Sequence, residues 1–181
     1  MRRYLPAIVP SAIAGGLFAW LWINRTFVIV EESPEMPNVK LYPREAPYAA
    51  AIARAESDAG VPSRLLASLL YQESHYRPDI ISGAVRSSKK AMGIAQFMPD
   101  TAREWLGMPE AALDPYKAIP AAGRYLAWCK KYTGGTWRDA VMAYNWGPGA
   151  VKTWIANGRP AMKVPLETRK YAVSVYDTIY A

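Results

Sequence analysis

Apolar side chains recur at helical spacing along most of residues 48–180. Residues three and four positions apart lie on one side of a helix, so this spacing predicts amphipathic helices. Gly60 and Gly107 each follow such a stretch, and glycine commonly ends a helix. We predict helices over residues 48–59, 62–73, 99–106, 114–132, 137–144, 148–156 and 165–180. The fold class is therefore mainly α.

The segment 77–92 is polar and irregular, which predicts a loop. A small β-hairpin within residues 80–95 stays open as an alternative. No other part of the chain shows convincing strand alternation, and there are no internal repeats.

The first 30 residues form a segment of their own. Residues 4–24 carry no charge and are long enough to cross a bilayer as a helix. Arg2 and Arg3 precede this stretch and Arg25 follows it, which favours a cytoplasmic N-terminus. We predict an uncleaved membrane anchor over 1–30; a signal peptide cleaved after residues 12–14 is the alternative.

Residues 31–47 contain four prolines and mixed charge, which is typical of an extended linker. A single domain over 48–181 follows. The N-terminal orientation places this domain in the periplasm, outside the inner membrane.

Glu73 lies on the apolar side of its predicted helix, because Leu66, Leu69, Leu70 and Glu73 stand at helical spacing. A buried carboxylate is costly, so burial favours the protonated form that a general acid needs. A frayed last turn that points Glu73 to water is the other interpretation. The helix pattern alone does not decide between them.

Charge and composition exclude several classes of function. The net charge of +7 suits an anionic polymer or a membrane surface, and it is too small to indicate a nucleic-acid-binding protein. Cys129 is the only cysteine and His75 the only histidine, which argues against an internal disulfide, a metal site and a cysteine protease. We expect Cys129 to be packed in the core.

Four segments in order resemble a known family. They are Glu73-Ser74 at a helix end, GIAQFMP at 93–99, AYNWGPG at 143–149 and ETRKY at 167–171. Together they look like the soluble-lytic-transglycosylase-type family, which has a goose-type-lysozyme-like fold. The resemblance covers roughly residues 48–178.

The resemblance implies cleavage of the β-1,4 bond between N-acetylmuramic acid and N-acetylglucosamine in peptidoglycan, with formation of 1,6-anhydromuramic acid. It implies Glu73 as the single acid and base, and neither a metal nor another cofactor. The sugar's own 6-hydroxyl attacks, so no second carboxylate need act as nucleophile. Asp79 and Asp100 are the acids nearest to the motifs, and we expect loop solvation and helix capping from them.

The family also implies a set of substrate-binding residues. Gln96 and Met98 would hold sugar groups, Tyr144 would reach the carboxyl group or the substrate, and a core role for Met98 stays open. From Glu167 we expect a supporting hydrogen bond. The full set is Ser74, Ser82, Gly93, Gln96, Met98, Tyr144, Asn145, Trp146, Glu167 and Tyr171.

The chain departs from the common family pattern in the loop between Ser82 and Gly93, which is longer here. It carries Arg86, Lys89 and Lys90, and we hypothesise a mobile lip that contacts anionic stem peptides. The implied partners are peptidoglycan strands, together with a secretion machine, a pilus or a phage that infects its host. A hydrolytic muramidase and an inactive wall-binding scaffold are the alternative functions.

Overall fold

The computed structural model describes residues 40–85 and 90–180. The predicted anchor over 1–30, residues 31–39 of the predicted linker, and residues 86–89 of the predicted lip, with Arg86 and Lys89, lie outside these residues. Within them, no helix has the length and apolar character that crossing a bilayer requires. The compact unit begins at Lys40, so residues 40–47, assigned above to the linker, belong to the folded domain.

The described chain is helical, in the order η1 (Ala46–Tyr48), α1 (Ala49–Ala59), α2 (Leu65–Ser74), α3 (Pro78–Ile81), α4 (Pro99–Leu106), η2 (Pro109–Leu113), α5 (Pro115–Thr133), α6 (Trp137–Trp146), α7 (Pro148–Ala156), η3 (Ala161–Lys163), α8 (Leu166–Ala172), the π-helical turn η4 (Val173–Asp177) and α9 (Thr178–Tyr180). Residues 40–85 and 90–180 contain no strand; a single antiparallel bridge joins Met92 to Phe97. The mainly α class is confirmed, and the hairpin alternative reduces to this bridge.

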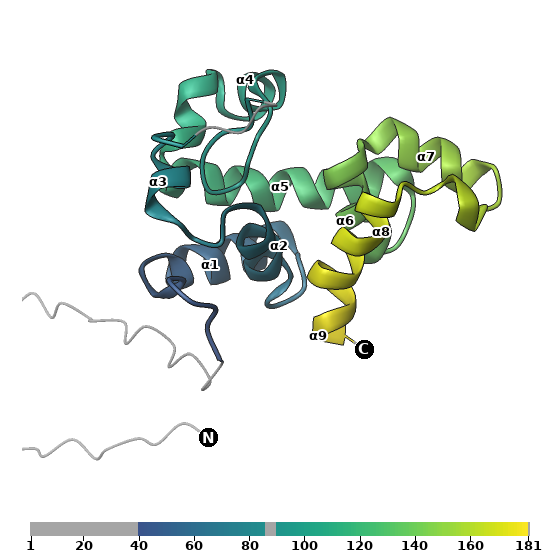
Figure 1. The fold of residues 1–181 in the computed structure, drawn as a ribbon, viewed down its shortest axis with the longest axis horizontal. Helices are drawn as coiled ribbons and strands as arrows, with labels where there is room; N and C mark the ends of the chain where they lie inside the picture. The colour runs from purple at the N-terminus through teal and green to yellow at the C-terminus, as the bar shows by residue number, and fades with distance from the viewer. Residues whose placement is uncertain (1–39, 86–89, 181) are drawn as a thin grey trace, which may run out of the picture. The chain divides into compact units, whose positions relative to one another are not determined.

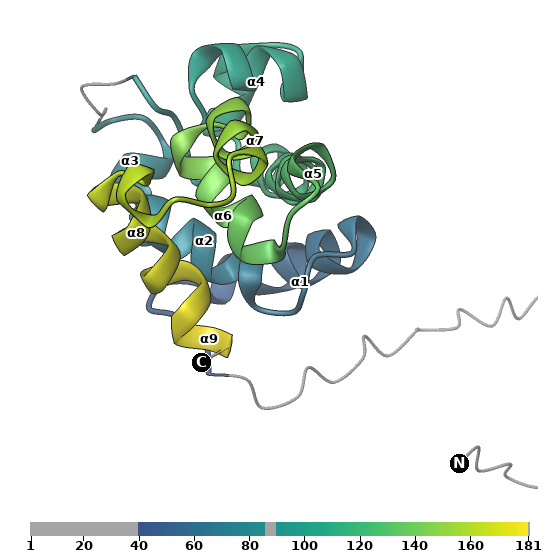
Figure 2. The same ribbon diagram turned by 90° about the vertical axis from the view of Figure 1, so that its right-hand side faces the viewer.

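The long helix α5 forms the centre of the domain. It packs against α1, α4, α6 and α7, and in Figure 1 it runs across the molecule between α4 on one side and α1 with α2 on the other. Figure 2 views α5 nearly end-on, with α6 beside it. The helix starts at the Asp114 cap, whose carboxylate accepts from the Tyr116 backbone N–H at 3.0 Å, and it continues through Pro120 as predicted.

Small residues bring α5 close to α1. Ala118, Ala121 and Ala122 are fully buried. A methyl group on Gly123 would lie 3.1 Å from the Ala55 carbonyl oxygen of α1, so a larger side chain would separate the two helices. Helix α6 packs on α5, and α8 packs on α6 in turn.

Helix α2 begins at Leu65 rather than at Pro62, because the buried carboxylate of Glu56 caps its start. Glu56 accepts hydrogen bonds from the backbone N–H groups of Arg64, Leu66 and Ala67 at 2.9 to 3.2 Å. These groups have no partner within a helix, so a carboxylate from α1 satisfies them. The predicted start at residue 62 was wrong for this reason.

The segment before α1 is fixed by an ion pair. Glu45 is fully buried, and both of its carboxylate oxygens accept hydrogen bonds from the Arg64 guanidinium. The ring of Tyr42 stacks on Tyr71 of α2 with centroids 4.6 Å apart. Residues 42–45 therefore brace the helix that carries Glu73.

The predicted loop 77–92 contains the short helix α3, which Pro78 begins. Asp79 pairs with Arg77 in its first turn. The prediction of a loop was wrong over these four residues, because one helical turn is too short to show periodicity.

Candidate active site

The carboxylate of Glu73 is partly buried and accepts a hydrogen bond from the Tyr171 hydroxyl at 2.5 Å. Glu73 lies in the last turn of α2 and Tyr171 on α8, so the bond joins helices 98 residues apart. Burial raises the pKa of Glu73 to about 7, and the Tyr171 bond opposes that shift without overcoming it. The alternative in which a frayed turn points Glu73 to water is therefore wrong.

Two tyrosines surround this carboxyl group. Burial and the negative charge of Glu73 raise the pKa of both Tyr144 and Tyr171 well above the usual value. Both hydroxyls therefore keep their protons at neutral pH. The Tyr144 hydroxyl donates to the Ala95 carbonyl at 2.8 Å, which ties α6 to the loop that carries Gln96.

That loop, residues 93–96, is a tight turn closed by the bridge between Met92 and Phe97. Gly93 has a φ of +72°, and a methyl group there would lie 1.7 Å from the Ala112 carbonyl oxygen. Gln96 also has a positive φ, of +46°, and its side-chain amide donates to the Gly93 carbonyl at 2.8 Å. The glycine is needed both for its conformation and for its close contact with η2.

Asn145 and Ser74 are held by neighbouring groups. The Asn145 side-chain oxygen accepts from the Thr168 hydroxyl at 2.8 Å, which links α6 to α8 beside Tyr171. Ser74 is fully buried; its hydroxyl donates to the Leu70 carbonyl and accepts from the Tyr76 N–H. The geometry of Ser74 is that of a residue that closes the end of α2.

The other predicted site residues lie on the surface. Ser82 is exposed and its hydroxyl donates to the Asp79 carbonyl at 3.4 Å. Met98 is 45% exposed at the start of α4, so the core alternative for Met98 is wrong. Glu167 is exposed on α8, and its side chain makes no hydrogen bond to another described residue, in contrast to the predicted supporting bond.

The remaining acids near the motifs make surface ion pairs. Asp79 pairs with Arg77, and Asp100 pairs with Arg103 at 2.7 Å. Asp100 lies inside the first turn of α4 and caps no helix, so the capping role predicted for it was wrong. The residues that the structure describes contain no cluster of three or more His, Cys, Asp and Glu side chains suited to a metal.

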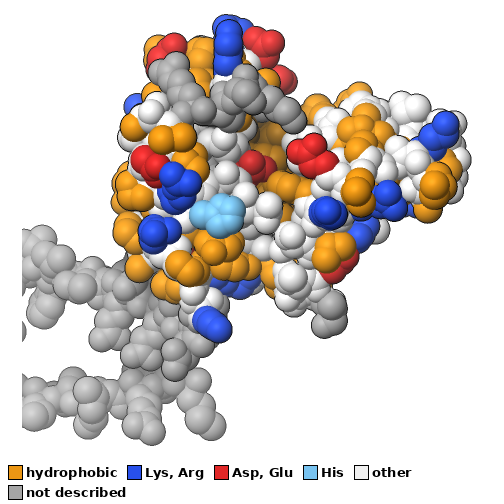
Figure 3. All heavy atoms as spheres, in the orientation of Figure 1, with side chains coloured by type: hydrophobic (Ala, Val, Ile, Leu, Met, Phe, Trp, Pro, Cys, Tyr) orange, Lys and Arg blue, Asp and Glu red, His pale blue; other side chains and the backbone are white. Residues whose placement is uncertain are grey.

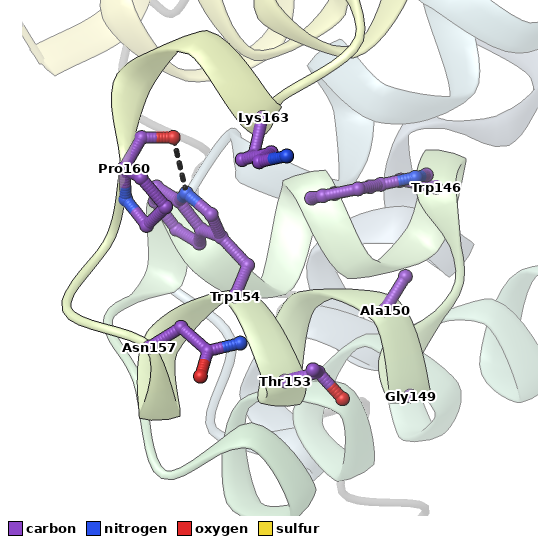
Figure 4. A pocket seen from close by; sticks show the side chains of 8 residues that line it. All are labelled: Trp146, Gly149, Ala150, Thr153, Trp154, Asn157, Pro160 and Lys163. Atoms are coloured by element: carbon purple, nitrogen blue, oxygen red, sulfur yellow. Dashed lines mark hydrogen bonds between the residues drawn. The ribbon is translucent and has the colours of Figure 1, made fainter.

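Trp146 lines a separate pocket of about 580 Å³ beside α7. Its lining residues all come from positions 146–163 and do not include Glu73 (Figure 4). The face of the molecule drawn in Figure 3 also has a hollow with hydrophobic side chains on its floor and acidic side chains in it and at its edge.

Sequence reasoning missed three residues that hold the site together. Phe97 and Tyr125 pack on the Tyr144 ring, with centroids 6.2 and 5.2 Å from it. The third is Thr168, the partner of Asn145. Thr168 lies inside the motif at 167–171 and Phe97 inside the motif at 93–99, and these positions were the signals in the sequence for two of the three.

Comparison with known proteins agrees with this geometry. The family described as the transglycosylase SLT domain matches residues 46–163. The chain is similar to the soluble lytic murein transglycosylase of Escherichia coli (strain K12), 30% identical over 145 residues, which are 70% of this chain and 22% of that protein. The protein of the same description from Salmonella typhimurium is 32% identical over 127 residues, 60% of this chain and 19% of its own length.

Two solved structures are similar as well. The 70 kDa soluble lytic transglycosylase from Escherichia coli has a TM-score of 0.60 at 30% identity, over 71% of this chain and 22% of that one. An inactive mutant of the lytic transglycosylase Slt from Pseudomonas aeruginosa has a TM-score of 0.58 at 29% identity, over 74% and 24%. This chain spans less than a quarter of the length of each relative.

Proposed function

The chain belongs to the transglycosylase SLT domain family, and on that premise we propose that it is a peptidoglycan lytic transglycosylase. It cleaves the β-1,4 bond between N-acetylmuramic acid and N-acetylglucosamine and leaves a 1,6-anhydro ring on the muramic acid. The observation that carries this proposal is the Glu73 carboxyl group, with a pKa of about 7 and a hydrogen bond from Tyr171.

Glu73 first acts as the acid. With a pKa of about 7, roughly half of the Glu73 carboxyl groups carry a proton at neutral pH. Because Tyr171 donates to Oε1, the other oxygen, Oε2, is left to carry the proton in this mechanism. That proton passes to the N-acetylglucosamine oxygen as the bond from it to the muramic acid C1 breaks.

Glu73 then acts as the base. The carboxylate removes the proton of the muramic acid 6-hydroxyl, whose oxygen forms the new bond to C1. Glu73 ends the cycle protonated and no water is consumed. While Glu73 is anionic, the Tyr171 hydroxyl stabilises it through a charge-assisted hydrogen bond.

The surroundings of Glu73 favour this reaction over hydrolysis. Burial and the Tyr171 bond account for its pKa, and no other carboxylate among the described residues contributes. Glycosidases that hydrolyse the bond place a second carboxylate about 5 to 9.5 Å from the first. Asp79 and Asp100 are surface acids already paired with arginines.

We further propose that residues 4–24 anchor the chain in the inner membrane, with the N-terminus in the cytoplasm and the folded domain in the periplasm. The charge-free sequence of 4–24 between arginines supports this arrangement. An anchored enzyme opens the wall locally, as an envelope-spanning secretion machine or an infecting phage requires. The full chain should need detergent to stay in solution, and residues 31–181 should not.

Digestion of purified sacculi tests the reaction itself. The wild type should release muropeptides that mass spectrometry identifies as anhydro forms, and Glu73→Gln should release none. Reducing-end muropeptides would indicate a muramidase instead. No turnover by the wild type, with biological activity kept by Glu73→Gln, would indicate a scaffold.

A further inference from the structure

The lining of the pocket beside α7 includes neither Glu73 nor the residue that donates to it. Its volume of about 580 Å³ lies within the range of small-molecule sites. It is lined by Trp146, Gly149, Ala150, Thr153, Trp154, Asn157, Pro160 and Lys163. Tyr144 and Tyr171, which surround Glu73, are absent from this lining.

Two indole rings form the sides of the pocket. Figure 4 shows Trp154 and Trp146 on opposite sides of it, with α7 running below them: Thr153 lies between the two rings, and Ala150 and Gly149 lie below Trp146. Small residues on that stretch of helix keep the space between the rings open. An open space between two indoles suits a flat ligand with apolar faces, such as the C–H faces of a pyranose ring.

Trp154 is fixed in position by its surroundings. Its Nε1–H donates to the Pro160 carbonyl at 3.2 Å, and the Arg159 guanidinium lies 5.3 Å from the ring centroid. Arg159 in turn pairs with the buried Asp139 at 2.6 Å. A ring held by these contacts loses little freedom when a ligand binds, which favours binding.

The charge of the pocket further restricts which ligands with apolar faces would bind there. Lys163 is the only charged residue among the eight that line it. Asn157 and Thr153 add an amide and a hydroxyl that suit sugar hydroxyls and acetamido groups. Lys163 pairs with no carboxylate in the part of the chain that the structure describes, and its ammonium group favours a ligand that carries a carboxylate.

We propose that this pocket is a second saccharide site, which binds an N-acetylated amino-sugar unit with an acidic substituent away from Glu73. The inference rests on the proposed function for its ligand class, because muramic acid carries a lactyl carboxyl group or an acidic peptide attached to it. A glycan strand, or a neighbouring strand in the wall, is held here while Glu73 cuts elsewhere. The site therefore serves retention on the wall and takes no part in catalysis.

Indole N–H signals in NMR spectra of the full chain in detergent micelles report this pocket directly. Titration with the disaccharide GlcNAc-MurNAc, which has a free lactyl carboxylate, should shift the Trp154 and Trp146 signals in a saturable way. Thr153→Tyr should abolish both shifts, because the larger side chain fills the pocket. Thr153 is exposed, so this change does not enter the core.

The neutral disaccharide GlcNAc-GlcNAc separates the role of charge. It should bind about threefold more weakly than GlcNAc-MurNAc, the size of effect typical of an exposed ion pair. Lys163→Ala should remove that difference. Equal affinity of the two disaccharides for the wild type would overturn the acidic part of the proposal.

Failure of this inference is distinct from failure of the proposed function. Thr153→Tyr should leave anhydro-muropeptide release from short soluble substrates unchanged and lower retention of the protein on sacculi. Turnover without any saturable shift at Trp154 overturns the second site alone. A shift caused by an apolar tripeptide and not by either disaccharide overturns it in favour of a peptide site.

Discussion

Replacing Glu73 by glutamine should stabilise the fold at neutral and alkaline pH. Burial raises the Glu73 pKa from 4.5 to about 7, so the native state binds the proton more tightly than the unfolded chain does. Ionisation of Glu73 therefore does not reduce the free energy of unfolding below pH 4.5, and it reduces that free energy increasingly as the pH rises to 7. At ~1.4 kcal/mol per pH unit, the cost of ionising Glu73 reaches ~3 kcal/mol above pH 7.

Glutamine has no charge to bury, and its side-chain oxygen can still accept from Tyr171. The wild type and Glu73→Gln should unfold with equal free energies at pH 4.5, and the variant should be ~3 kcal/mol more stable at pH 8. That difference corresponds to roughly 10 °C in Tm for a domain of this size.

Circular dichroism melts of both proteins from pH 4.5 to 8.5 measure this difference. Glu110→Gln, at an exposed acid in η2, serves as the control and should show no such trend. Melting temperatures of wild type and Glu73→Gln that stay parallel across the whole range would refute a buried acid at this position.

Three further substitutions test the site and its support. Tyr171→Phe removes a hydrogen bond that lowers the Glu73 pKa, so the pKa should be higher in the variant. A pH–rate profile should show kcat/KM falling above about pH 7 in the wild type and at a higher pH in the variant. Gly93→Ala forces a methyl group onto a carbonyl oxygen and should cost more than ~3 kcal/mol in a urea titration. Arg64→Ala leaves the buried Glu45 carboxylate without its ion-pair partner and should lower the free energy of unfolding by ~3–5 kcal/mol in the same titration.

Each of these has a matched control. Tyr116→Phe removes an exposed hydroxyl and should leave the pH–rate profile in place. Gly60 also has a positive φ, but a methyl group there would have no atom within 4 Å, so Gly60→Ala should cost only ~1 kcal/mol. Arg103→Ala breaks an exposed pair and should change stability by less than ~0.5 kcal/mol. A cost for Gly93→Ala no greater than that for Gly60→Ala would contradict the close contact with η2.

The helices that sequence predicted best are those with strong boundary signals. Pro99 and Gly107 bound α4, and Asp114 with Pro115 starts α5, as the pattern indicated. Local residues specify these boundaries, so a local pattern finds them. The start of α2 depends on the carboxylate of Glu56 from another helix, and periodicity carries no information about such a contact.

Local sequence likewise placed one part of the candidate site and carried no information about the contacts between distant residues. Helical spacing placed Glu73 on the apolar side of α2. Its bond to Tyr171 crosses 98 residues, so only the family resemblance could bring the two together. Trp146 lines the pocket near α7, because two helical positions turn its side chain away from the direction of Tyr144, and its part in substrate binding stays a prediction.

The long span between Glu73 and Tyr171 also has a consequence for the order in which the domain assembles. A ribosome makes α2 well before α8, so an emerging chain carries Glu73 before the hydroxyl that donates to it. The surroundings that set the acidity of Glu73 are therefore complete only after α8 has packed against the earlier helices.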